Sequence, residues 1–138
     1  FLVSCDNAHA LHPNHAEKTD AVNFVTMNGG IVIKESANQK YTTDAFSRAL
    51  FTGVCQNVNV PVQSFANRSD VVGGSTLGNL SNTQVSVHAV DFGLAQLAMH
   101  SCFETAGVKD TEYAIVALKE FYETNVQIEE AESVCLEK

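Results

Sequence analysis

Short apolar runs alternate along this chain with stretches of helical periodicity, and this alternation constrains the fold more than any other feature of the sequence. Residues 1–5, 31–34 and 60–65 are rich in β-branched or aromatic side chains, a pattern typical of strands. From residue 46 to 54, apolar side chains recur at the i, i+3, i+4, i+7 and i+8 positions of an amphipathic helix, after capping candidates at 42–44. Strands that alternate with helices predict an α/β fold.

Other segments carry weaker signals. Residues 7–30 are polar and interrupted by Pro13 and Gly29, which predicts a long loop or an irregular hairpin. Residues 79–87 are expected to form a short helix, and 86–91 a strand. A clearer helix is expected to open at Asp110 or Thr111. Its apolar side chains keep the helical period at Ala114, Ala117, Leu118, Phe121 and Tyr122. The acidic tail, which contains Glu129, Glu130, Glu132 and Glu137, is expected to fray.

Charge and cysteine content narrow the possible partners. The 138 residues, about one domain, include 16 acidic and 8 basic side chains, for a net charge of −8. Such a surface repels phosphate backbones, so no nucleic-acid partner is expected. The apolar runs are far shorter than the roughly 20 residues of a membrane-spanning helix, so no membrane partner is expected either. Four separated cysteines without a CxxC pair indicate reduced thiols and a cytoplasmic location.

Several isolated groups could carry chemistry. His9, His12 and His15 recur every third residue, but Pro13 disfavours a helix there, so solvated loop histidines are favoured over a metal site. Asp6, after the first apolar run, and His100 are each a possible metal ligand; the alternatives are a turn-forming carboxylate and a structural histidine.

The glycine-rich segment at 73–78 has the spacing of a phosphate loop, with Gly73 and Gly78 in the glycine positions. It lacks the Lys and Ser/Thr that should follow, because Asn79 and Leu80 stand there, so a nucleotide site is excluded. Either a simple turn or a backbone that approaches a ligand closely remains open for this segment.

Three motifs in order resemble those of the M18 metalloaminopeptidases, the aspartyl aminopeptidase family. They are Ser-Cys-Asp-Asn-Ala-His-Ala-Leu-His-Pro-Asn at 4–14, Gly-Ser-Thr-Leu-Gly at 74–78, and Asp-Phe-Gly-Leu-Ala-Gln-Leu-Ala-Met-His-Ser at 91–101. Segments 33–34 and 39–41 also align, and the resemblance extends to about residue 123. The related M42 family is an alternative, but the Asp-Asn-Ala-His-x-x-His-Pro-Asn run favours M18.

The resemblance implies a cocatalytic dizinc aminopeptidase that removes N-terminal residues, often Asp or Glu, from peptides and assembles as a homo-oligomeric dodecamer. It implies that Asp6 binds one zinc ion and His100 the other. Lys34 would pair with an acidic substrate side chain. The resemblance also places a further set of residues near the substrate: His9, Tyr41, Gly74, Ser75, Thr76 and Met99.

Other parts of the family's site have no counterpart here. Family members carry a ligand histidine, a bridging aspartate and a Glu-Glu pair, which includes the general base, upstream of the first motif; the pair at 129–130 is in the wrong order. No general base is therefore expected within this chain. Residues 1–138 are interpreted as the C-terminal half of a zinc-peptidase catalytic domain, a mixed sheet flanked by helices. The N-terminal portion and an inserted dimerisation domain would be absent, and the fragment alone inactive. A non-catalytic assembly or scaffold homologue is the alternative from a different functional class.

Overall fold

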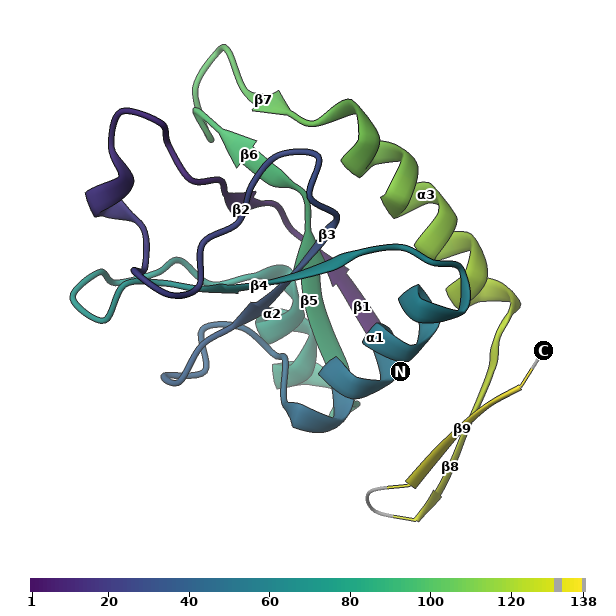
Figure 1. Ribbon diagram of the computed structural model, residues 1–138. Coiled ribbons are helices and arrows are strands. Elements are labelled where there is room, and N and C mark those ends of the chain that lie inside the picture. Colours follow the sequence, from purple (N-terminus) through teal and green to yellow (C-terminus); the bar gives the residue numbers. More distant parts are fainter. Residues whose placement is uncertain (131–132, 138) are drawn as a thin grey trace.

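The computed structural model describes residues 1–130 and 133–137 and is built around a four-stranded mixed sheet (Figure 1). Its strand order is β1 (Leu2–Cys5), β5 (Ala89–Gly93), β3 (Ile31–Glu35) and β4 (Val62–Ala66). β1 is parallel to β5 and β3 to β4, whereas β3 and β5 are antiparallel. The expected α/β class with a mixed sheet flanked by helices is confirmed. Three of the four strands lie at or within two residues of the predicted positions, and β5 begins three residues later than predicted.

Ile31, Val32, Ile33 and Lys34 are all buried. Since side chains alternate between the faces of a strand, both faces of β3 are buried. Ile31 and Ile33 pack into a core cluster with Phe51 of the first helix and Phe92 of β5. Val32 packs into a second cluster on the opposite face, together with residues of loops and of the other sheet. Lys34, two positions after Val32, belongs to that second face and is only 4% exposed.

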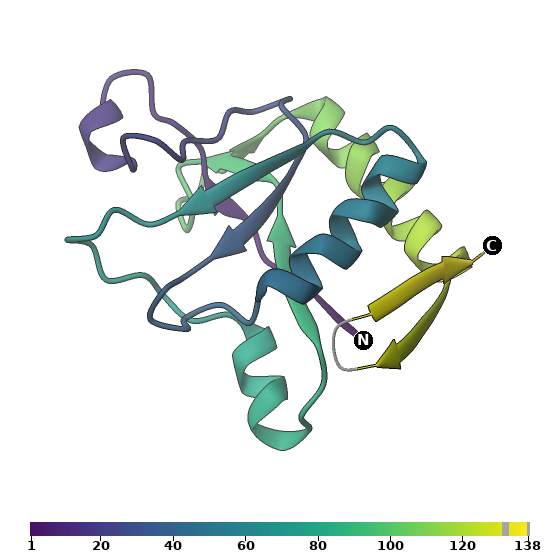
Figure 2. The ribbon, with the colours of Figure 1, turned by 60° about the horizontal axis from the view of Figure 1, so that its bottom comes forward.

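Two helices cover the face that carries Ile31 and Ile33, as Figure 2 shows for α1 (Ala45–Asn57) and α3 (Val108–Glu123). α1 begins in a capping box in which the Ser47 amide donates to the Asp44 carboxylate at 2.7 Å and the Asp44 amide to the Ser47 hydroxyl at 3.0 Å. The ring of Phe51 lies 4.9 Å from Phe92 and 6.3 Å from Phe121, centroid to centroid. These aromatic contacts join both helices to the sheet.

Two details of the third helix differ from the prediction. α3 begins at Val108, before the predicted Asp110 or Thr111, because the Asp110 side chain bonds a distant loop instead of capping the helix. Tyr122 is 81% exposed rather than packed, because a step of about 100° per residue turns it outward next to the packed Phe121.

A second, smaller sheet extends the first. Its strands β2 (Ala8–His9), β6 (Ala95–Leu97) and β7 (Thr105–Ala106) are short, and the rest of residues 7–30 is loop apart from a 3₁₀ turn, η1 (Ala16–Lys18). The predicted irregular character of this segment is thus confirmed. The β1–β2 and β5–β6 connections run side by side, and a Cβ on Gly93 would lie 2.1 Å from the Asp6 carbonyl oxygen. Only glycine fits at this crossing.

The remaining elements correct two expectations. The short helix α2 (Leu77–Gln84) begins two residues earlier than predicted, because Thr76 occupies its N-cap position. The acidic tail does not fray: β8 (Asn125–Glu130) and β9 (Ser133–Glu137) form a hairpin after α3. Val126 pairs with Leu136 and Ile128 with Val134, so an apolar alternation supports the hairpin despite its charge. Of the predicted tail residues, Glu132 lies outside the described residues.

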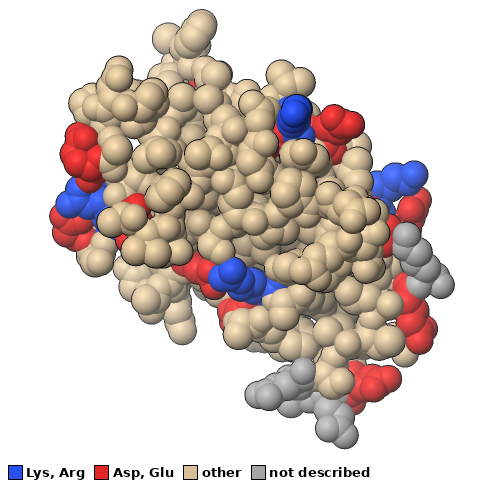
Figure 3. All heavy atoms as spheres, viewed as in Figure 1, with Lys and Arg blue, Asp and Glu red and all other residues tan. Residues whose placement is uncertain are grey.

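The described residues form no cluster of basic side chains on the face that Figure 3 shows. In Figure 3, Lys and Arg side chains on the visible face are separate from one another and lie beside Asp or Glu. All four cysteines are free thiols. Within residues 1–130 and 133–137, no helix has the length and hydropathy to cross a membrane.

Candidate functional site

A cavity of about 240 Å³ lies where the two sheets meet. Its lining comes from the ends of β1, β2 and β3 and from the loops before α2 and after β6. These segments are far apart in sequence, yet the structure brings together eight of the residues that sequence reasoning placed at a metal or substrate site: Asp6, His9, Lys34, Tyr41, Gly74, Ser75, Met99 and His100.

Lys34 is the most buried charged group of the cavity. Its Nζ donates to Asp6 Oδ2 at 2.6 Å and to the Asn7 carbonyl at 3.1 Å, and it lies 4.5 Å from the centre of the Tyr41 ring. The Asp6 side chain is 48% exposed, whereas that of Lys34 is 5% exposed. The Lys34 ammonium therefore faces the cavity and not bulk solvent.

Tyr41 and His9 stay uncharged beside this ion pair. Burial raises the pKa of the Tyr41 phenol, which accepts a hydrogen bond from Asn67 Nδ2 at 2.9 Å. Burial, assisted by the positive charges of Lys34 and His100, lowers the pKa of His9, and Asp6 opposes the shift. The cavity therefore offers a neutral imidazole and a phenol next to a buried ammonium.

His100 reaches the cavity from a tight turn after β6. Ala98 and His100 both have left-handed backbone conformations, with φ of 55° and 67°. The Ser101 amide donates to the Ala98 carbonyl at 3.0 Å, and the His100 amide to Glu104 Oε1 at 2.6 Å. Non-glycine residues with positive φ cost energy, and such strain is common at functional sites.

Thr76 is the predicted substrate residue that the structure does not bring to the cavity. It is 3% exposed, and its hydroxyl donates to Asp91 Oδ2 at 2.9 Å, behind the loop that carries Gly74 and Ser75. Conversely, the sequence reasoning missed Asn67 and Asn7, which also line the cavity. Asn7 lies inside the first motif and could have been found there, whereas Asn67 lies outside the three motifs.

The sequence left two questions open: the role of the glycine-rich segment at 73–78 and the role of His9, His12 and His15. Gly73 and Gly74 line the cavity, so this backbone approaches the space a ligand would fill rather than forming a remote turn.

His12 and His15 border a neighbouring cavity of about 630 Å³, which His9 also lines. His12 Nδ1 accepts from the Asn14 amide, and His15 Nδ1 bonds Glu17 Oε1 at 3.0 Å. In the part of the chain that the structure describes, no group of three or more His, Cys, Asp or Glu side chains could hold a metal ion.

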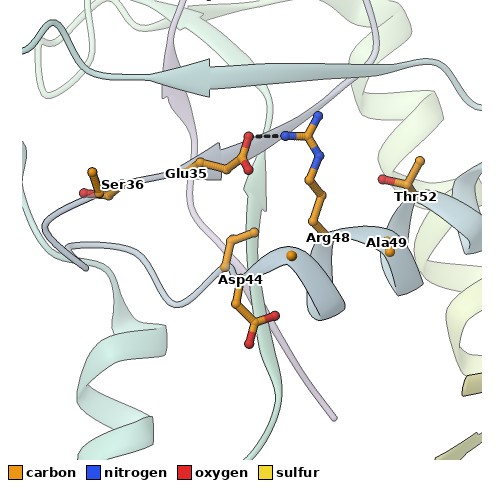
Figure 4. Close-up of a pocket in the computed structure, with 9 residues that line it drawn as sticks. Glu35, Ser36, Asp44, Arg48, Ala49 and Thr52 are labelled. Carbon is orange, nitrogen blue, oxygen red and sulfur yellow. Dashed lines mark hydrogen bonds and ion pairs between the residues drawn. The ribbon is translucent and has the colours of Figure 1, made fainter. Parts of the chain in front are cut away.

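A third depression lies between the end of β3 and the first turns of α1, and an ion pair crosses it. Figure 4 shows Arg48 of α1 reaching Glu35 at the end of β3. Arg48 also donates to the Ser64 hydroxyl of β4 at 2.7 Å. These contacts join α1 to two strands, so the groove is a structural junction.

Asp6 and His100 carry donor types that zinc binds, a carboxylate oxygen and an imidazole nitrogen. Both line the same cavity, and half of the Asp6 side chain is open to solvent. Zinc sites in proteins use about four ligands, or three with an open position. The donor chemistry therefore fits zinc, but the two residues form only part of a metal site.

Comparison with known proteins identifies the family of this chain. Residues 1–122 match the family model described as "Aminopeptidase I zinc metalloprotease (M18)". The chain is 48% identical over 122 residues to a probable M18 family aminopeptidase 2 of Clostridium novyi, a match that covers 88% of this chain and 28% of that protein. The chain thus spans less than a third of that relative's length.

Solved structures show the same fold. One chain of a cryo-EM structure of an Ape4–Nbr1 complex superposes with a TM-score of 0.87 and 43% identity, over 88% of this chain and 23% of that one. The mApe1 dodecamer of S. cerevisiae superposes with a TM-score of 0.76 and 27% identity, over 88% and 26%. The family match favours M18 over the M42 alternative. From the match of its sequence and its fold, this chain belongs to the M18 family of zinc metallopeptidases.

Proposed function

We propose that this chain forms part of the catalytic domain of a zinc-dependent aminopeptidase that removes acidic N-terminal residues. The observation that carries the proposal is the position of Lys34, whose buried ammonium lies in the same cavity as Asp6 and His100. A buried ammonium needs an anionic partner. In the substrate complex, that partner would be the side-chain carboxylate of an N-terminal Asp or Glu.

The size and polarity of the cavity support an exopeptidase. The part of the cavity that these residues form has a volume of about 240 Å³, which supports contact with a single residue. His9, held neutral by burial, offers a nitrogen acceptor to the substrate's terminal ammonium group. The Tyr41 ring lies against Lys34 Nζ and keeps its charge facing the cavity.

Asp6 and His100 would each hold one of two zinc ions. Zinc, when bound, supplies Lewis-acid polarisation of a carbonyl and lowers the pKa of bound water. Asp6 accepts from Lys34 through Oδ2 alone, so its Oδ1 would be the oxygen available to a metal, and a substrate carboxylate would be a further acceptor for Lys34. Further ligands and the general base would come from other parts of a longer M18 protein, so the 138 residues alone are expected to be inactive.

The assembled protein would be a cytoplasmic homo-oligomer. A neighbour in fold was solved as a dodecamer, which supports an oligomer here, and the free thiols suit a reducing compartment. A non-catalytic scaffold homologue remains the second candidate function; it predicts no turnover by the full-length protein.

Substitution of Lys34 tests the proposal. In the full-length protein, Lys34→Glu should lower kcat/KM for aspartyl and glutamyl anilides by at least about tenfold, because it places a like charge against the substrate carboxylate. Alanyl and leucyl anilides should be affected less. Lys109→Glu, the same charge change at an exposed position on α3, is the control and should leave the preference unchanged. An unaltered acidic-to-neutral ratio in Lys34→Glu would refute the assignment.

A further inference from the structure

We propose that Asp91 is a positioning residue that fixes two walls of the substrate cavity relative to the central sheet. The inference rests on the proposed function, because it concerns the same cavity. Asp91 does not line the cavity; it lies behind it on β5, fully buried. It would therefore act through the segments that it holds.

One carboxylate oxygen of Asp91 binds both segments. Oδ2 accepts from the Thr42 amide at 2.7 Å, the Thr42 hydroxyl at 2.7 Å and the Thr76 hydroxyl at 2.9 Å. The Asp91 amide in turn donates to the Thr43 hydroxyl at 2.9 Å. Residues separated by 49 and 15 positions from Asp91 thus converge on a single atom.

Each of these partners adjoins a wall of the cavity. Thr42 directly follows Tyr41, whose ring lies against Lys34 Nζ. Thr76 directly follows Gly74 and Ser75, which also line the cavity. A displacement of either threonine would move the adjoining residues, because neighbouring Cα atoms are a fixed distance apart.

A second contact joins the same two walls from the outside. Asn79 of α2 donates through Nδ2 to the Ser75 hydroxyl at 3.0 Å and to the Gln39 carbonyl at 3.2 Å, with a further bond to the Lys40 carbonyl. Asp91 and Asn79 therefore each bond both segments. Asp91 ties both segments to β5, whereas the Gly78 amide, which donates to the Ser4 hydroxyl of β1 at 3.1 Å, ties only the second segment to the sheet.

Two costs at Asp91 argue against a role in stability alone. Its other oxygen, Oδ1, is buried without a hydrogen-bond partner among the described residues, which is unfavourable for a carboxylate. Thr76, the N-cap of α2, makes no side-chain capping bond because its hydroxyl is turned to Asp91. Within the described part of the chain, two stabilising hydrogen bonds are thus absent, one at Asp91 Oδ1 and one at the N-terminus of α2, while the loops beside the cavity are held in place.

The first measurement is hydrogen exchange in the full-length protein. Asp91→Ala should speed exchange by at least about tenfold in both segments 39–44 and 73–78, because it removes the shared acceptor. Asp91→Asn, which keeps one oxygen, should restore most of the protection. Thr76→Val removes one donor alone, should speed exchange in 73–78 only, and keeps the inference testable if Asp91→Ala does not fold.

Asp110→Asn is the matched control, because Asp110 is also a fully buried carboxylate that accepts from backbone amides, but at residues 28 and 30. It should speed exchange around 26–30 and leave the two cavity segments protected. Fast exchange in neither cavity segment of Asp91→Ala, or in only one of them, would overturn the inference.

The second measurement is turnover by the full-length protein. Asp91→Ala should raise KM for aspartyl anilide at least about fivefold with kcat within about twofold, because the walls bind substrate but do not react. Asp110→Asn should leave KM unchanged. An equal rise in KM in both variants would refute positioning by Asp91. Absence of turnover by the unsubstituted protein would refute the proposed function instead, and the exchange measurement would still decide whether Asp91 ties the walls.

Discussion

The junction between α3 and the loop before β3 depends on Asp110, and its removal should cost measurable stability. Asp110 is fully buried in the first turn of α3. Its Oδ1 accepts from the buried Gly30 amide at 2.9 Å and its Oδ2 from the more exposed Asn28 amide at 2.6 Å. Asn28 and Gly30 both have positive φ, 63° and 112°, so the turn that presents these amides is tightly constrained.

The expected magnitude follows from the burial of the two amides. A hydrogen bond to a charged group contributes about 1.5–3 kcal/mol, which applies in full to the buried Gly30 amide. Water can replace part of the bond at Asn28, so we assign it about 0.5–1.5 kcal/mol. Asp110→Ala should therefore lower the free energy of unfolding by about 2–4 kcal/mol, a large part of a typical total of about 5–15 kcal/mol. Asp110→Asn retains one acceptor and should cost about half as much.

Urea unfolding followed by far-UV circular dichroism measures this effect. With an m-value of about 2 kcal/mol per molar urea, in the middle of the usual range, the midpoint for Asp110→Ala should fall by about 1–2 M. Glu112→Ala, which removes an exposed carboxylate two residues further along α3, should change stability by less than about 0.5 kcal/mol. Equal midpoints for Asp110→Ala and Glu112→Ala would show that these hydrogen bonds do not hold the junction.

Three further predictions concern the metal, the isolated chain and a buried thiol. In the full-length protein, Asp6→Ala and His100→Ala should each lose bound zinc, because each removes a donor; full occupancy by elemental analysis in either variant would refute the assignment. The 138-residue chain alone should not hydrolyse aspartyl anilide, since it holds two of the expected ligands and no expected general base; chelator-sensitive turnover would contradict this. Burial raises the pKa of Cys55 to about 12 from 9.0, so its neutral thiol contributes stability that is complete below pH 9 and is lost as the pH rises toward 12. Iodoacetamide at pH 8 should accordingly label the exposed Cys102 in the native chain and Cys55 only in urea; rapid native labelling of Cys55 would show that it is accessible.

Much of the architecture could be predicted from local pattern. The β-branched run at 31–34, the capping box and apolar stripe of α1, and the helical period after residue 107 each depend on side chains within a few positions of one another. The errors occurred where a distant contact decides the outcome. α3 starts earlier because Asp110 bonds residues some 80 positions away, and the tail pairs as a hairpin because its apolar residues match across two strands.

At the candidate site, too, local sequence identified the residues and the tertiary structure decided their contacts. Motifs identified its residues one by one, since each motif is a local string of letters. That Asp6 and Lys34 form an ion pair across 28 positions, that Thr76 turns away from the cavity to Asp91, and that Asn67 joins Tyr41 were decided by the tertiary structure. The physical reason is that local periodicity reports which face of a strand or helix a side chain takes, whereas contacts across the chain depend on strand register and on how each loop closes.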